Sequence, residues 1–180
     1  MAGRDGTSWI TYNGEIYNYI ELRRQLQARG HSFVSQSDTE VVLQMYEAYQ
    51  ENCLEHFNGM FAFAIWDGQR RRLFAARDRL GIKPFYYYSN GDILVFASEI
   101  KSLLQHPRVR AAVDYQGLQD YLDLQYCLGD KTLFAGIKRL LPGHCLSWEK
   151  GQVQVRRYWD LDFAPDTSTS EADFVEQISA

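Results

Sequence analysis

A nearly continuous run of apolar residues in the middle of the chain, residues 60–66, does most to restrict the fold. An Asp67-Gly68 turn and a second apolar stretch, residues 73–76, follow it. Two such stretches joined by a loop of several residues are typical of a β-hairpin that is buried on both faces. The sequence therefore predicts an antiparallel sheet at the centre of the core.

The flanking segments predict further strands and helices around this hairpin. Residue patterns favour strands at 9–12, 31–34, 85–88, 93–97, 144–148 and 153–158, and helices at 19–29, 99–105 and 114–124. Another helix is expected after Ser37, which forms a capping box with Glu40 ahead of an apolar stripe. Runs of strands with helices beside them indicate the α+β class.

The composition excludes several classes of protein. A chain of 180 residues with 46% apolar residues supplies a sizeable core, which excludes disordered and fibrous proteins. The chain has 19 basic and 23 acidic residues and therefore a net charge of -4. Because a phosphate backbone attracts basic proteins, we expect no nucleic-acid partner. No run reaches the ~18 apolar residues of a membrane span, and the first residues lack the apolar stretch of a signal peptide. We therefore expect a cytoplasmic protein without membrane contact.

The cysteines and histidines do not indicate a metal site. Cys53, Cys127 and Cys145 lie far apart and are odd in number, which suits neither a disulfide framework nor a metal-ligand pair. We expect them to be reduced, buried thiols. The four histidines show no ligand spacing, so none is assigned to a metal or to a catalytic triad.

A change in composition after residue 160 predicts a domain boundary. Residues 161–170 are polar and short-chained and contain a proline, as linkers do. Residues 171–180 then begin an apolar helical stripe, and so few residues form a marginal helix alone. We expect one domain in residues 1–160, a linker in residues 161–170, and in residues 171–180 the start of a further domain's first helix.

The Asn13-Gly14 pair allows two interpretations. A side-chain amide beside a flexible backbone N–H can hold an oxyanion, because a carbonyl oxygen that becomes tetrahedral needs two fixed donors about 3 Å away. The same pair also forms tight turns in which the asparagine bonds its own backbone. On these two residues alone, a turn after the strand at 9–12 is the favoured interpretation.

The segment around Asp38 also has a structural and a functional interpretation. Ser37 and Glu40 explain it as a helix cap, with Asp38 facing the positive end of the helix. Alternatively, Asp38 at the lip of that helix holds a substrate ammonium group. Both interpretations hold together, because capping by Ser37 and Glu40 leaves the Asp38 oxygens free.

A charged segment, residues 77–84, follows the second strand of the hairpin. It allows a phosphate-binding or partner-binding loop. An ion pair between Asp78 and a neighbouring arginine around the Gly81 turn is the favoured interpretation.

Several motifs taken together resemble one family. In order, they are residues 12–18, 37–40, 58–67, 77–87, 96–101 and 142–144. They resemble the glutaminase domain of glutamine-hydrolysing asparagine synthases, a class II glutamine amidotransferase, and the likeness covers residues 8–159. The resemblance implies an N-terminal-nucleophile fold, in which two antiparallel sheets lie between helix layers in an αββα sandwich. This fold agrees with the α+β class.

The resemblance also implies a reaction and roles for four residues. In such enzymes an N-terminal cysteine attacks the side-chain amide of glutamine, its own α-amino group acts as the base, and ammonia is released. By this likeness Asn13 and Gly14 form the oxyanion hole, while Glu15 and Asp38 hold the α-amino end of glutamine. These roles require the Asn13 amide and the Asp38 carboxylate to face a common cavity.

The implied partner of this segment is a synthase domain further along the chain. By the resemblance, that domain activates aspartate with ATP and Mg²⁺, and ammonia then displaces AMP. No cofactor is expected in the present segment itself.

The sequence also departs from the family pattern. Members begin Met-Cys-Gly-Ile and carry an arginine segment that clamps the glutamine carboxylate, and neither precedes the strand at 9–12. Removal of Met1 would expose Ala2, which has no nucleophile. We therefore expect a fragment truncated at both ends that does not hydrolyse glutamine alone. Its exposed sheet edges predict aggregation or pairing with a second copy as a homodimer.

Two other functions stay open at this point. One is a non-catalytic glutamine-binding or partner module, in which Asn13, Glu15 and Asp38 serve binding only. The other is the amidotransferase domain of a different amide ligase, which modifies peptides or sugars instead of aspartate.

Overall fold

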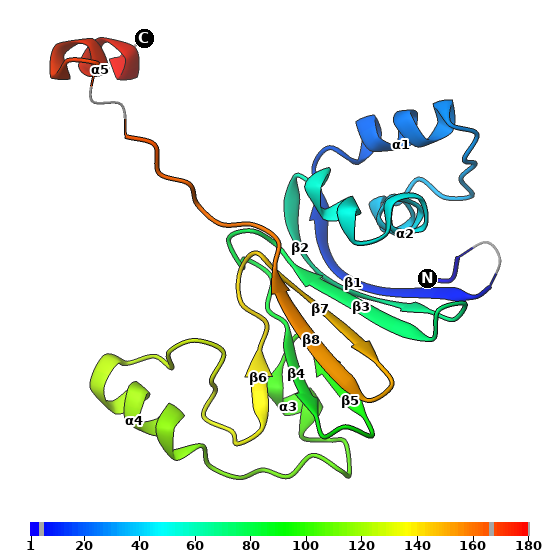
Figure 1. Cartoon of the computed structure of the whole chain (residues 1–180), viewed down its shortest axis with the longest axis vertical. Coiled ribbons are helices and arrows are strands. Elements are labelled where there is room, and N and C mark those ends of the chain that lie inside the picture. Colours follow the sequence, from blue (N-terminus) through cyan, green and yellow to red (C-terminus); the bar gives the residue numbers. More distant parts are fainter. Residues whose placement is uncertain (4–5, 166–167, 180) are drawn as a thin grey trace.

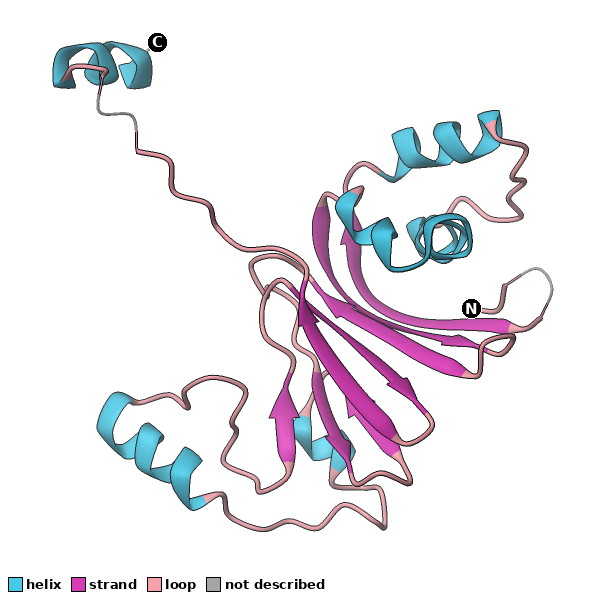
Figure 2. Ribbon diagram, in the orientation of Figure 1, coloured by secondary structure: helices cyan, strands magenta, loops and turns pink. Residues whose placement is uncertain are grey.

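The computed structural model describes residues 1–3, 6–165 and 168–179. Two antiparallel sheets lie at its centre (Figure 1). Helices cover the outer face of the larger sheet, and further helical segments lie beyond the smaller one (Figure 2). This arrangement confirms the α+β class.

The larger sheet has five strands in the order β1-β2-β3-β7-β8, and the smaller has three in the order β5-β4-β6. Every neighbouring pair is antiparallel. The strand bounds are β1 Ser8–Ile16, β2 Gly59–Asp67, β3 Arg72–Arg77, β4 Tyr86–Ser89, β5 Leu94–Ala97, β6 Ile137–Arg139, β7 His144–Glu149 and β8 Gln152–Arg157.

Six helical segments complete the described part of the chain. They are α1 Tyr19–Ala28, α2 Asp38–Tyr49, the 3₁₀ segment η1 Gln50–Glu55, α3 Ile100–Leu103, α4 Tyr115–Leu124 and α5 Glu171–Ser179. The predicted helix at 99–105 is shorter in the structure, while those at 19–29 and 114–124 are confirmed within one residue.

The apolar run at the centre of the sequence forms β2 and is buried on both faces, as predicted. Phe61, Phe63 and Ile65 pack against α1, α2 and η1 in the largest core cluster. Ala62 and Ala64 face the smaller sheet in a second cluster. Large side chains toward the helices and small ones toward the other sheet thus set the spacing of the two layers.

Two predictions about the first forty residues are wrong. Asn13-Gly14 is not a turn, because β1 continues through both residues to Ile16 in register with β2. Residues 31–34 do not form a strand, because the backbone N–H of Val34 bonds the Glu40 carboxylate and not a neighbouring strand.

The cap of α2 differs in detail from the predicted capping box. The Ser37 hydroxyl accepts a hydrogen bond from the Thr39 N–H at 3.1 Å, as a cap residue should. The Glu40 carboxylate, however, does not reach the Ser37 N–H. It accepts hydrogen bonds from the N–H groups of Val34 and Ser35 and from the Ser35 hydroxyl, so it fixes the loop that precedes α2.

Asp78 organises the charged loop after β3, but not through the predicted ion pair. Its carboxylate is 1% exposed and accepts hydrogen bonds from four backbone N–H groups. The donors are Phe61, Leu80, Ile82 and Lys83. The neighbouring Arg77 instead donates to the carbonyls of Gly81, Lys83 and Leu140. Both charged side chains thus form hydrogen bonds with backbone groups of the loop and its neighbours, and not with each other.

The last described residues lie away from both sheets. Residues 158–165 form no helix or strand, and residues 171–179 form α5, of which no residue is buried (Figure 1). Ser170 caps α5, since its hydroxyl accepts a hydrogen bond from the Asp173 N–H at 3.3 Å. The helix is confirmed at this place, and its assignment to a further domain stays an expectation.

We predict that Asp78→Ala strongly destabilises the fold. Four buried or half-buried N–H groups lose their common acceptor, which should lower the free energy of unfolding by roughly 3 kcal/mol. Urea denaturation measures the change. The matched control is Asp92→Ala, which removes an exposed carboxylate paired with Arg108 and should cost at most about 1 kcal/mol. Equal losses for both variants would contradict the role given to Asp78.

We also predict that Glu40 makes the stability depend on pH in acid. Burial alone would raise the pKa of Glu40, but hydrogen bonds from Ser35 and Val34 outweigh it and lower the pKa below its ordinary 4.5. A lowered pKa stabilises the fold above the unfolded-state value, and this stability is lost as pH falls through the folded-state value.

Glu40→Gln should therefore unfold at a lower urea concentration than the unchanged chain at pH 7. The difference should shrink as the pH falls below about 4.5, where the unfolded-state carboxylate begins to protonate. Glu21→Gln, an exposed change on α1, serves as the control. A difference that stays constant from pH 7 into acid would contradict the prediction.

Candidate functional site

Three of the four candidate residues, Asn13, Gly14 and Glu15, are consecutive on β1. The alternation of side chains along this strand therefore determines the face to which each one points. Ile10 and Ile16 belong to the core beneath the helices. Because side chains alternate along a strand, Asn13 and Glu15 point to the opposite face, toward the smaller sheet. There the Asn13 amide nitrogen lies 3.3 Å from the Ser98 hydroxyl at the end of β5.

Glycine is required at position 14 because β2 comes very close. A Cβ atom on Gly14 would lie 2.2 Å from the Met60 carbonyl oxygen and 2.7 Å from the Phe61 Cα. Glycine is also required at position 59 on β2, because a Cβ atom there would lie 2.2 Å from the Glu15 carbonyl oxygen on β1. The glycine thus allows close strand approach and does not make a turn.

The backbone N–H of Gly14 points away from β2. Its partner in the ladder, Phe61, directs both backbone groups to the other side: its N–H to the Asp78 carboxylate and its carbonyl to the Asp78 N–H. The Gly14 and Phe61 pair is therefore a non-hydrogen-bonded pair, in which the two strands approach most closely. The Gly14 N–H faces the outer edge of the sheet, of which β1 is the end strand.

This outer edge is partly covered at its two ends. At one end Met1 and Ile10 exchange backbone hydrogen bonds of 2.8 and 2.9 Å. At the other end the Ile16 N–H donates to the Asp38 carboxylate at 3.1 Å. The stretch between them, which includes Gly14, presents a backbone donor at the open edge of the sheet.

Asp38, the first residue of α2, is held at this edge by one of its oxygens. Oδ2 accepts a hydrogen bond from the Tyr12 hydroxyl at 2.6 Å as well as the one from Ile16. Burial and the adjacent Asp38 carboxylate raise the pKa of Tyr12, so Tyr12 stays a protonated donor. The expectation that both Asp38 oxygens are free is therefore wrong for Oδ2. Oδ1 accepts no hydrogen bond from a described residue.

The structure does not bring the four residues into one cavity. Asn13 lines a small cavity of about 190 Å³ between the sheets, together with Phe85, Phe96 and Ser98, and Asp38 does not line it. Asp38 lies on the helix side of β1, and Glu15 is exposed on the side of Asn13. The common cavity that the resemblance requires for the Asn13 amide and the Asp38 carboxylate is therefore not formed by the described residues. What the four residues share is the edge of β1, with Asn13 on one side, Asp38 on the other and the Gly14 N–H between them.

Two neighbours of these residues, Tyr12 and Ser98, have roles that the sequence does not predict. Tyr12 orients the Asp38 carboxylate, and Ser98 accepts a hydrogen bond from the Asn13 amide. Both lie inside the segments that carry the family resemblance, at residues 12–18 and 96–101. Their contacts depend on tertiary packing, so spacing in the sequence does not reveal them.

The three cysteines have structural surroundings. Cys53 and Cys145 are buried in the main core cluster, and burial raises the pKa of both thiols. Cys127 is half-buried and donates a hydrogen bond to the Gly117 carbonyl at 3.4 Å. The prediction of reduced, buried thiols is confirmed for Cys53 and Cys145.

The described residues form neither a cluster of metal ligands nor a membrane-spanning helix. Within residues 1–3, 6–165 and 168–179, no three carboxylate, histidine or cysteine side chains gather as metal ligands do. None of the helices in these ranges has the length and hydropathy to cross a bilayer.

Comparisons with known proteins show the family of the chain. A family model for the glutamine amidotransferase domain matches residues 1–159. Asparagine synthetase [glutamine-hydrolyzing] 3 of Bacillus subtilis is 47% identical over 91% of the chain, which covers 27% of that protein. Asparagine synthetase [glutamine-hydrolyzing] 1 of the same organism is 41% identical over 99% of the chain and 28% of its own length. The chain thus spans about a quarter of the relatives it matches.

A solved structure supports the fold independently of close sequence similarity. Glutamine phosphoribosylpyrophosphate amidotransferase from B. subtilis, complexed with ADP and GMP, superimposes with a TM-score of 0.60 at 20% identity. The match covers 88% of this chain and 31% of that one. The expected amidotransferase fold of two antiparallel sheets between helix layers is confirmed. The chain belongs to the glutamine amidotransferase domain family, and it resembles the glutaminase part of asparagine synthases.

Proposed function

We propose that this chain is the glutamine-binding part of the glutaminase domain of an asparagine synthase. In the whole protein, this domain would release ammonia from glutamine for the ATP-dependent amidation of aspartate. The observation that carries the proposal is the edge of β1 in the described part of the chain, where the Gly14 N–H lies two residues before the Ile16 N–H that bonds the Asp38 carboxylate. It supports a shared site for Gly14 and Asp38, and not a cavity shared by Asn13 and Asp38. The high identity to two asparagine synthetases supports the choice of aspartate over other acceptors.

The four residues have distinct roles in this proposal. Asn13 and Gly14 supply the amide donors of an oxyanion hole, which favours the tetrahedral intermediate over the planar amide. Asp38 and Glu15 supply the negative charge that holds the ammonium group of glutamine. Tyr12 positions Asp38, because its hydroxyl donates to the carboxylate oxygen that does not meet the substrate.

Other parts of the proposal concern the whole protein and its partners. ATP and Mg²⁺ belong to a synthase domain, as does the aspartate that is amidated. We further propose a cytoplasmic location and the pairing of two copies through exposed sheet edges, of which β8 is one in the described part of the chain.

We predict that residues 1–180 release no ammonia from glutamine by themselves. The reaction needs an accessible thiolate whose own amino group acts as base. Cys53 and Cys145 are buried with raised pKa values, and Cys127 is an internal residue, so none fulfils this requirement. An ammonia-release assay on the purified chain tests this. Turnover above a buffer control would refute it. Glutamine binding detected by calorimetry without turnover would favour the non-catalytic binding module, because a fragment without the arginine segment that clamps the glutamine carboxylate should not bind glutamine detectably.

A second prediction concerns the role of Asp38 in a hybrid enzyme. In the hybrid, residues 8–159 of this chain replace the matching part of the 47% identical B. subtilis enzyme. Asparagine formation is then measured with glutamine and, separately, with ammonia. Asp38→Asn keeps the shape but removes the charge. It should lower kcat/KM with glutamine roughly ten- to a hundredfold, since a charge-assisted hydrogen bond contributes about 1.5–3 kcal/mol.

The same hybrid contains its own controls. Activity with ammonia should stay unchanged in Asp38→Asn, because ammonia bypasses the glutamine site. Asp92→Asn, which neutralises an exposed carboxylate in the turn between β4 and β5, should leave both activities unchanged. Equal use of glutamine by the Asp38→Asn hybrid and the unchanged hybrid would rule out a substrate-holding role for Asp38.

A further inference from the structure

The side chain of Asn13 connects the two sheets. In the described part of the chain, Asn13 lies on an outer strand of the larger sheet, β1, and Ser98 follows an outer strand of the smaller one, β5. The Asn13 Nδ2 donates a hydrogen bond to the Ser98 hydroxyl at 3.3 Å. Both residues line the cavity of about 190 Å³ between the sheets. The amide that the proposed function places in the oxyanion hole is therefore bonded to a residue 85 positions later in the chain.

Ser98 is held in place by the elements on either side of it. Ala97, the last residue of β5, pairs with Tyr86 on β4. Helix α3 begins at Ile100, and Leu103 on this helix is completely buried. Ser98 itself is half-buried. Because the strand before it and the helix after it are both anchored by packing, the Ser98 hydroxyl offers the amide an acceptor in a fixed position.

The other side chains around this pair are mostly apolar. Ala62, Phe85 and Phe96 line the same cavity, and the rings of Phe85 and Phe96 stack with their centroids 5.5 Å apart. Apolar side chains accept no hydrogen bond, so they cannot replace the Ser98 hydroxyl as the partner of the amide. The bond to Ser98 therefore determines the orientation of the amide at this wall of the cavity.

The bond to Ser98 leaves one N–H of the Asn13 amide available. An asparagine amide carries two N–H donors on one nitrogen, and its χ2 torsion is broad and roughly twofold where nothing restrains it. Ser98 accepts one of these donors and so fixes the plane of the planar amide. The second N–H then has a fixed direction, as an oxyanion hole requires of its donors.

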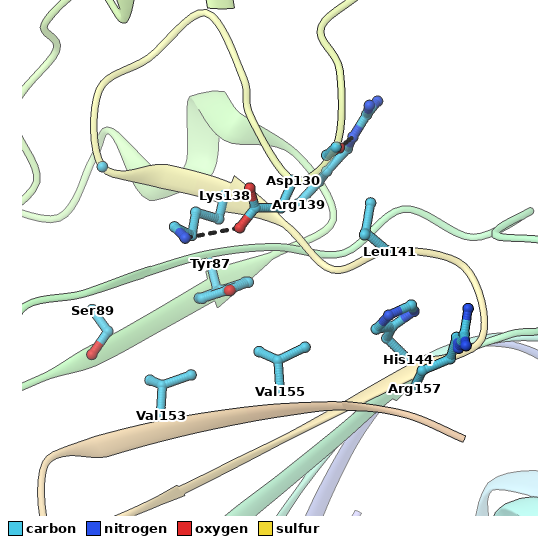
Figure 3. A pocket seen from close by; sticks show the side chains of 12 residues that line it. Tyr87, Ser89, Asp130, Lys138, Arg139, Leu141, His144, Val153, Val155 and Arg157 are labelled. Atoms are coloured by element: carbon cyan, nitrogen blue, oxygen red, sulfur yellow. Dashed lines mark hydrogen bonds and ion pairs between the residues drawn. The ribbon is translucent and has the colours of Figure 1, made fainter. Parts of the chain in front are cut away.

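The charged groups that line a larger cavity are, in contrast, already engaged. This cavity, of about 870 Å³, lies between β8 and the smaller sheet (Figure 3). Lys138 pairs with Asp130 at 2.8 Å. Arg157 pairs with Asp160, and Arg139 donates to two backbone carbonyls. A spare donor with a fixed direction thus distinguishes the small cavity between the sheets from this larger one.

We propose that Ser98 is a positioning residue for the oxyanion hole. It acts through Asn13, because its hydroxyl accepts one N–H of the amide and leaves the other directed at the oxygen that becomes negative in the tetrahedral intermediate. Ser98 itself does not contact the substrate. The inference rests on the proposed function of Asn13, and it adds a residue of the smaller sheet layer to a site otherwise built on β1 and α2.

Nuclear magnetic resonance of residues 1–180 tests the positioning without any substrate. Nitrogen relaxation of the Asn13 side-chain NH2 group measures the motion of the amide. Ser98→Ala should increase this motion, because the amide loses its acceptor. Ser102→Ala is the matched control, since Ser102 is exposed on α3, and it should leave the motion unchanged. A folded Ser98→Ala chain in which the Asn13 amide moves no more than before would overturn the proposal.

Kinetics of the hybrid with the B. subtilis enzyme test the effect on the reaction. Ser98→Ala should lower kcat with glutamine roughly three- to tenfold and leave KM unchanged, because the oxyanion exists only after the amide is attacked. Ser98→Thr keeps the hydroxyl and should retain the rate. Asparagine formation from ammonia should be unchanged in both variants. A rise in KM alone, or an equal loss with ammonia, would contradict a positioning role.

A double-mutant cycle separates an action through Asn13 from a general structural effect. Asn13→Ala should lower glutamine use more than Ser98→Ala does, because it removes the donor itself. In the Asn13→Ala background, Ser98→Ala should cause no further loss. Equal losses in both backgrounds would overturn the proposal.

The same cycle distinguishes failure of this inference from failure of the proposed function. If Asn13→Ala leaves glutamine use unchanged, the proposed role of Asn13 is wrong, and the role of Ser98 is wrong with it. If Asn13→Ala lowers glutamine use and Ser98→Ala does not, only the inference about Ser98 is refuted.

Discussion

The candidate site depends on the pairing of β1 with β2, which in the described part of the chain is the only strand beside β1 in its sheet. At the centre of that pairing, Gly14 meets Phe61 in a non-hydrogen-bonded pair, because Phe61 gives both of its backbone groups to Asp78. The same pair brings the strands so close that only glycine fits. One constraint thus fixes the residue type at position 14 and also turns its N–H toward the open edge.

The groups around this edge are held by polar side chains that are themselves buried or half-buried. Asp78 ties the loop after β3 to β2, Glu40 ties the loop before α2 to that helix, and Tyr12 ties Asp38 to β1. In each case a carboxylate takes hydrogen bonds from backbone or hydroxyl donors. Such bonds position a site more rigidly than exposed ion pairs do.

The sequence predicts the parts of the fold that rest on periodicity. The apolar run of β2 and the stripes of α1 and α2 appear where expected, because burial on one or both faces imposes a spacing. Prediction from the sequence pattern fails where hydrogen bonds of polar groups determine the backbone conformation. Asn13-Gly14 has the composition of a turn but lies inside a strand, and residues 31–34 have the composition of a strand but bond Glu40. Family resemblance, and not local pattern, identified the candidate site.

Amide hydrogen exchange along β1 shows whether the Gly14 N–H is free to meet a substrate oxygen. By strand alternation, the N–H of Asn13 bonds β2 while that of Gly14 faces the open edge. The Gly14 amide should therefore exchange far faster than the Asn13 amide in the folded chain, although the two are neighbours. Equal protection of the two amides would mean that the Gly14 N–H is already engaged, and the edge could not then offer it to a substrate oxygen.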